Sequence, residues 1–155
     1  NATISIIAFN YGARKPERMT KTLKIACGAA FLFMLVGLAS FQLLPEALLG
    51  MFNPTDEFMH MGVKALRIIS LSFPVAAFGI ILSASFQALG NGIYSTLVSL
   101  CRQLVVLLPV AYLLSLTGDV NSVWWSFPIA EVVSLAVTLL LYRRLYRKKI
   151  SPLFQ

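Results

Sequence analysis

An uncharged apolar run of 20 residues, 25–44, constrains this chain more than any other feature of its sequence. At about 1.5 Å per residue, a helix of that length crosses a hydrocarbon core of about 30 Å. A water-soluble domain rarely carries such a run, because each of its surface helices must turn one polar face to water. The run therefore predicts a transmembrane helix.

Three further apolar segments follow the first and are expected to span the membrane over residues 66–89, 93–116 and 123–142. The composition agrees, since 58% of the residues are hydrophobic and 12% are charged, against about a quarter charged in ordinary soluble domains. We therefore predict an all-α membrane protein with four transmembrane helices. Residues 1–9 are expected to be the end of another, truncated transmembrane helix, and residues 10–155 to form part of one helical lobe.

The charged residues predict how these helices are oriented. Most of the Lys and Arg residues lie in two blocks, at 14–24 and 143–149, and the net charge is +7. The connections after the first and third spans instead carry carboxylates, which are Glu46, Asp56, Glu57 and Asp119. Since Lys and Arg favour the cytoplasmic side, we expect a multi-pass protein of the cytoplasmic membrane with both basic ends in the cytoplasm. Charges placed at span boundaries indicate contact with membrane lipids, and no nucleic-acid partner is expected.

Two ionisable residues interrupt the last two spans. Arg102 and Glu131 each lie about 15 Å deep, close to the middle of the bilayer, when counted at about 1.5 Å per residue. An ionisable group at that depth is costly when alone, so it normally faces the interior of a bundle and finds a partner. The third and fourth spans are antiparallel, and an ion pair between these residues is predicted. It has two interpretations: a contact that holds helices together, or a part of a transport pathway.

Other polar residues and prolines inside the spans are weaker candidates. Gln87 and Gln103 either hydrogen bond between helices or belong to a substrate or ion pathway. Each proline within a span removes a backbone hydrogen bond and crowds the preceding turn, so each is a candidate for a helix kink. These are Pro74, Pro109 and Pro128. Near Pro74 we predict a bend.

Motifs for enzyme chemistry do not occur. The sequence has no glycine-rich phosphate loop, no GxSxG and no HExxH, and the lone His60 has no triad partner in view. Cys27 and Cys101 each lie within an apolar run, far from any further metal ligand. We therefore expect neither an enzyme nor a metal site nor a cofactor.

An ordered set of short motifs resembles the carboxy-terminal half of the multidrug and toxin extrusion (MATE) transporters. The set covers nearly the whole chain in order, and it is this order that makes it specific. It consists of Asn10-Tyr11-Gly12-Ala13, Leu44-Pro45-Glu46, Met51-Phe52, Asp56-Glu57, Leu66-Arg67-Ile68, Phe86-Gln87-Ala88-Leu89-Gly90, Arg102-Gln103 and Phe127-Pro128-Ile129-Ala130-Glu131.

This resemblance implies a twelve-helix antiporter in two lobes, of which the four spans would be helices 9–12. Such a protein exports small organic, often cationic, compounds in exchange for Na⁺ or H⁺. The partners implied are the amino-terminal lobe and the remaining helices of the same lobe. The sodium-coupled branch carries an acidic residue in the middle of helix 10, whereas residues 68–89 hold no carboxylate. That departure argues against sodium coupling through this segment and leaves the amino-terminal lobe as its place.

Two alternatives remain open from the sequence. One is a flippase of the same superfamily that moves a lipid-linked oligosaccharide. The other is a four-helix membrane scaffold without transport activity, which the truncated helix within residues 1–9 argues against.

Overall fold

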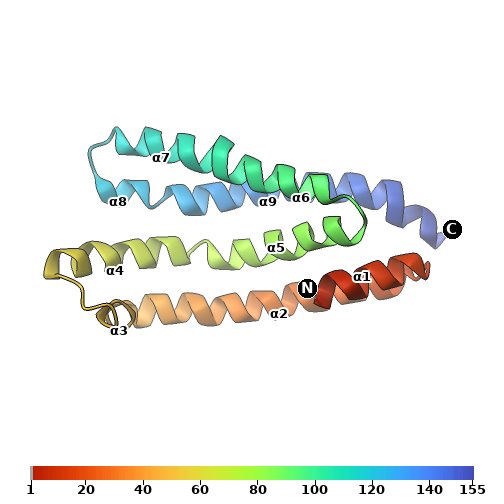
Figure 1. The fold of residues 1–155 in the computed structure, drawn as a ribbon, viewed down its shortest axis with the longest axis horizontal. Coiled ribbons are helices and arrows are strands. Elements are labelled where there is room, and N and C mark those ends of the chain that lie inside the picture. The colour runs from red at the N-terminus through yellow and green to blue at the C-terminus, as the bar shows by residue number, and fades with distance from the viewer. Residues whose placement is uncertain (1) are drawn as a thin grey trace.

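The computed structural model describes residues 2–155, and the described residues form helices and connecting turns without any strand. Long helices run side by side along one axis and reverse direction at each end of the molecule (Figure 1). In chain order the elements are α1 (Ala2–Gly12), α2 (Pro16–Leu43), α3 (Pro45–Gly50), α4 (Asp56–Ser70), α5 (Phe73–Ala88), α6 (Gly92–Leu100), the π-helix η1 (Cys101–Leu107), α7 (Leu108–Ser115), α8 (Val120–Val123), α9 (Ser126–Leu145), the π-helix η2 (Tyr146–Ile150) and the 3₁₀-helix η3 (Ser151–Phe154).

Three of the described stretches are long and apolar enough to cross a membrane, namely Pro16–Leu43, Gly92–Ser115 and Val120–Phe154. The pair α4 and α5 passes the same test together, which makes four spans when the pair counts as one. The prediction of an all-helical membrane protein is confirmed. The bounds differ from the apolar runs, because the helices continue into the charged segments at both ends.

The first span begins well before its apolar run, at Pro16. This proline occupies the first turn of α2, where its missing N–H costs nothing and its fixed φ suits the helix. The basic segment 18–24 is therefore the first part of the transmembrane helix itself. The helix ends before Pro45, and the Leu44 N–H closes the last turn by donating to the Ser40 carbonyl.

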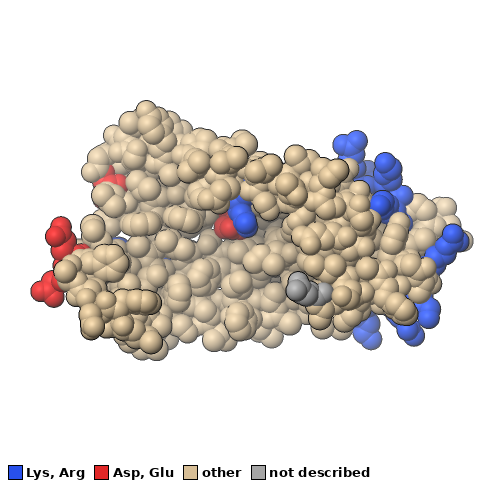
Figure 2. All heavy atoms as spheres, in the orientation of Figure 1, with Lys and Arg blue, Asp and Glu red and all other residues tan. Residues whose placement is uncertain are grey.

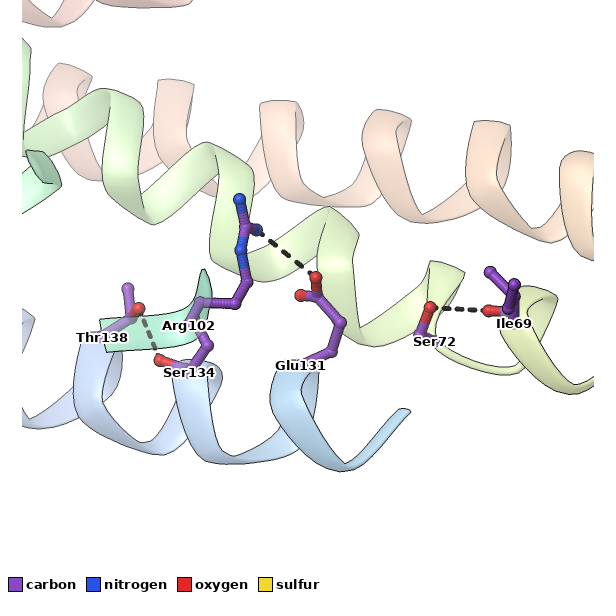
Figure 3. A network of polar contacts seen from close by, with 6 residues as sticks. All are labelled: Ile69, Ser72, Arg102, Glu131, Ser134 and Thr138. Atoms are coloured by element: carbon purple, nitrogen blue, oxygen red, sulfur yellow. Dashed lines mark hydrogen bonds and ion pairs between the residues drawn. The ribbon is translucent and has the colours of Figure 1, made fainter. Parts of the chain in front are cut away.

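The second span is broken in the middle. The predicted continuous helix over 66–89 is wrong, because α4 ends at Ser70, α5 begins at Phe73, and the two axes meet at 51°. The predicted bend near Pro74 is confirmed, since Pro74 cannot donate to the Ser70 carbonyl and lies in the first turn of α5. Figure 3 includes this break, where the Ser72 hydroxyl donates to the Ile69 carbonyl at 2.6 Å.

The prolines of the last two spans act differently from the prediction of a simple kink. Before Pro109 the helix stays continuous but widens into η1, whose Leu108 N–H donates to the Gln103 carbonyl five residues earlier. Such π-helical segments are rare and favour functional sites. Pro128 lies in the first turn of α9, after a turn at Trp124 and Trp125 that separates it from α8. The fourth helix therefore starts later than the predicted 123 and continues past 142.

Helix α5 has the central position, packing against α1, α2, α6 and α9. It turns into α6 through Gly90, whose φ of +73° is a conformation that favours glycine. The main cluster of buried apolar side chains lies where the end of α5, the start of α2 and the end of α9 meet. Its members are Ile7, Met19, Phe86, Leu89, Val98, Leu145 and Ile150.

Charge separates the two ends of the bundle. Ten of the 13 Lys and Arg residues come before residue 25 or after residue 142, and the blue surface in Figure 2 gathers at the end where both termini of the chain lie. We call this the basic end. The opposite end, with Glu46, Asp56, Glu57 and Asp119, is the acidic end. Between them, one blue and one red patch adjoin in an otherwise uncharged face (Figure 2).

Candidate functional site

A polar cavity of about 380 Å³ opens between α1, α5, α6 and α9, in the middle of the bundle. Its volume falls within the range of about 300–1,000 Å³ that small-molecule sites occupy. Six of its side chains carry hydrogen-bonding groups, and one of these is charged. They are Ser83, Gln87, Ser95, Ser99, Arg102 and Ser134.

Helical spacing brings these groups to one place. On α5, Gly79, Ser83 and Gln87 follow one another at intervals of four residues, which places them on one face. On α6 and η1, Ser95, Ser99 and Arg102 occupy positions i, i+4 and i+7, again a single face. The turn at Gly90 folds the two faces toward each other. A methyl group at Gly79 would meet no atom within 4 Å, so its surface opens into the cavity.

Two of these helices are joined by hydrogen bonds at one wall of the cavity. The hydroxyl oxygens of Ser83 and Ser95 are 2.7 Å apart, and the Gln87 amide donates to the Ser95 hydroxyl at 3.1 Å. Ser95 is 8% exposed. Within an apolar surrounding these bonds satisfy polar groups that have little access to water, which fixes the distance between α5 and α6.

The ion pair predicted from the matching depths of Arg102 and Glu131 is present. One guanidinium nitrogen lies 3.4 Å from a Glu131 carboxylate oxygen, and the side chains are 35% and 18% exposed. Figure 3 shows Arg102 reaching from η1 toward α5 and across to Glu131. On α9, Glu131, Ser134 and Thr138 point to the same side, at i, i+3 and i+7 (Figure 3). The pair joins the third span to the fourth.

The structure places the other candidates in separate positions. Gln87 and Arg102 line the cavity, whereas Glu131 contacts Arg102 without belonging to the lining. Gln103 is exposed and does not line the cavity; its backbone carbonyl takes part in the π-helical turn. Pro74, Pro109 and Pro128 all lie outside the lining.

Some lining residues were missed by the sequence reasoning. Ser95, Ser99 and Ser134 carry no charge and lie within apolar runs, so they did not stand out individually. The signal was their spacing relative to Arg102 and Glu131, which places Ser95 and Ser99 on the face of Arg102 and Ser134 one turn from Glu131.

Among residues 2–155, no three side chains of His, Cys, Asp or Glu gather in a way that could hold a metal ion. The cavity itself contains hydroxyls, one amide and one guanidinium as its polar groups. Such groups bind by hydrogen bonding and charge.

Similarity to known proteins extends along almost the whole chain. The MatE family profile matches residues 1–113. The multidrug export protein MepA of Staphylococcus aureus strain RF122 is 24% identical over 140 residues, which cover 90% of this chain and 31% of that protein. The chain thus spans about a third of the length of the curated relatives it matches.

Solved structures give the same picture. The MATE multidrug transporter DinF-BH, solved in complex with the dye rhodamine 6G, is 32% identical, with a TM-score of 0.78 over 92% of this chain and 31% of that one. A transporter of the MOP superfamily from Pyrococcus furiosus is 26% identical, with a TM-score of 0.87 over 99% and 34%. That second structure is described as having a binding pocket of reversed polarity that suggests a different function.

Proposed function

Because the chain belongs to the MATE family, we propose that it forms part of the carboxy-terminal lobe of a longer, ion-coupled exporter of small organic compounds. The observation that carries the proposal is the polar cavity, which lies halfway between the two ends of a membrane-spanning bundle and has a charged residue in its wall. Ionisable groups at such a depth are costly unless they serve binding or ion movement. A helical scaffold without transport would have no use for this arrangement.

Glu131 is our candidate for the coupling group of this lobe. It is the sole carboxylate that the sequence places in the apolar parts of the four spans. Proton uptake by Glu131 would remove the charge that attracts Arg102, which changes both the ion pair and the adjoining wall of the cavity. We propose exchange for H⁺ at this site, and Na⁺ exchange remains a property of the amino-terminal lobe if it occurs. No other cofactor is proposed.

The orientation we propose places the basic end in the cytoplasm and the acidic end outside. Single cysteines at Lys15, Asp119 and Lys148, introduced after replacement of Cys27 and Cys101 by alanine, test it in whole cells. An impermeant maleimide should label the cysteine at 119 and leave the other two unlabelled until the cells are opened. Labelling in the opposite pattern would reverse the orientation.

Export by the full-length transporter is measured in inside-out vesicles with an imposed pH or Na⁺ gradient and with rhodamine 6G as the transported dye. We expect the dye to accumulate in a pH gradient, and a loss of about tenfold or more in rate for Glu131→Gln. Glu57→Gln makes the same chemical change at the acidic end and should leave the rate unchanged. An inserted transporter that moves rhodamine 6G under neither gradient would contradict the proposal and favour the flippase or scaffold alternatives.

A further inference from the structure

The charge of the cavity wall differs from that of a site built for organic cations. Arg102 lines the cavity, and none of the other lining residues carries a charge. Glu131 neutralises Arg102 from the side but does not line the cavity. A cationic ligand would therefore meet a like charge with no carboxylate beside it.

Arg102 has unused capacity to donate hydrogen bonds. A guanidinium carries five N–H donors in a planar fork, and the contact with Glu131 is its one ion pair among residues 2–155, through a single nitrogen at 3.4 Å. Charge-assisted bonds of good geometry are shorter, at about 2.7–2.9 Å. The side chain is also 35% exposed. The fork is thus free to bind a second anion, for which its geometry suits the paired oxygens of a carboxylate or phosphate.

The serine hydroxyls add a donor on the facing wall. Ser95 accepts from Gln87, and Ser83 and Ser95 share one hydrogen bond between their oxygens. Whichever of the two donates in that bond, the hydrogen of the other hydroxyl is left over. One hydroxyl of the pair can therefore donate to a ligand in the cavity.

We propose that this cavity binds an anionic group of the cargo, such as a carboxylate, sulfonate or phosphate, through Arg102 and the serine hydroxyls. The inference rests on the proposed transport function and defines its substrate class at this lobe. Glu131 is then an internal competitor, because the carboxylate and the anionic group of the ligand attract the same guanidinium.

Competition predicts opposite effects for the two halves of the ion pair. The experiment uses the purified full-length transporter and two xanthene dyes of opposite charge, carboxyfluorescein and rhodamine 6G, with equilibrium binding followed by fluorescence polarisation. Arg102→Gln should weaken carboxyfluorescein binding about tenfold or more, and Glu131→Gln should strengthen it several-fold. Arg102→Lys keeps the charge without the fork and should give an intermediate affinity. Rhodamine 6G binding should not weaken in Arg102→Gln.

Arg144→Gln is the matched control, since it removes an exposed guanidinium at the basic end and should change neither affinity. Ser99→Ala is a milder change in the lining, and it should weaken carboxyfluorescein binding even if Arg102→Gln fails to fold. The inference is overturned if carboxyfluorescein binding is the same in wild type, Ser99→Ala and every folded Arg102 variant, or if Glu131→Gln weakens carboxyfluorescein binding.

Transport separates this inference from the proposed function. Vesicles that transport rhodamine 6G while carboxyfluorescein fails to bind would leave the exporter intact and refute the anion site. A protein that binds carboxyfluorescein through Arg102 yet moves neither dye would keep the anion site and refute the exporter.

Discussion

The two halves of the bundle bury different kinds of side chain. At the basic end, large apolar residues from α1, α2, α5 and α9 form one cluster around Phe86, which has no exposed surface. In the acidic half, the buried residues of α4, α5 and α9 are small, and Ser70, Ser126 and Ala130 are each at most 2% exposed. Large interlocking side chains resist sliding, whereas small ones let helices approach closely without interlocking.

The acidic half depends more on individual hydrogen bonds. At the break in the second span, the N–H of Leu71 donates to the Ile68 carbonyl, which leaves the Arg67 carbonyl without its usual partner. Gln42 of α2 donates to that carbonyl at 2.7 Å and to the Ser70 hydroxyl at 2.9 Å. Ser70 itself donates to the same carbonyl at 2.9 Å. We infer that the basic half is the rigid part of this lobe and that movement is concentrated beyond the cavity, toward the acidic end.

Phe86→Ala should have the largest effect on stability. The ring contacts Tyr94 edge-on, with centroids 5.9 Å apart, and fills the centre of the apolar cluster. Truncation of a buried Phe costs about 3–5 kcal/mol in soluble proteins. We expect at least about 2 kcal/mol here, because lipid replaces the transfer part of that energy but not the lost packing. The midpoint of thermal unfolding in detergent measures it.

Phe33→Ala is the control for that change, since Phe33 is 76% exposed on α2. Its unfolding midpoint should stay close to that of the wild type. Equal losses for the two variants would show that the basic half is not a packed core.

The Arg102–Glu131 pair should have the next largest effect, measured as a coupling. Each single glutamine variant leaves one charge with no partner in a poorly solvated place, so the two losses should exceed the loss in the double variant. We expect a coupling of about 1–3 kcal/mol in the free energy of unfolding. Additive losses would mean that the pair does not contribute to stability, whatever its part in binding.

Gln42→Leu should loosen the break without unfolding the bundle. It removes both hydrogen bonds to the end of α4, and side-chain bonds between membrane helices contribute about 0.6 kcal/mol on average. Because the Arg67 carbonyl keeps only Ser70 as a partner, amide hydrogen exchange should rise at residues 69–73. Ser40→Ala removes a hydroxyl that bonds within α2, to the Val36 carbonyl, and should leave exchange at the break unchanged.

Particular residues show how far the sequence determined this outcome. Charge and hydropathy were sufficient for the spans and for the pairing of Arg102 with Glu131, because burying an ionisable group in apolar surroundings has few solutions. Gln42 and the serines of the cavity were not identified, because a polar residue of this kind is tolerated on any face of a membrane helix. Which face it occupies depends on the neighbouring helix. The same holds for Ile150, an apolar residue of the basic tail that packs at 3% exposure against the cluster.

Lys149 should have the smallest effect of these changes, and it tests whether the tail belongs to the rigid half. Its ammonium group donates to the Leu89 carbonyl at 2.7 Å, at the carboxy-terminal end of α5. A positive charge there satisfies a free carbonyl and interacts favourably with the helix dipole, an effect of about 0.3–1 kcal/mol that salt screens. Lys149→Gln should therefore lower the unfolding midpoint slightly at low salt and less at high salt. Lys148→Gln removes the same charge from an exposed neighbour and should have no measurable effect. If both variants lose the same amount at every salt concentration, the contribution comes from net charge, and the tail is not fastened to α5 by this bond.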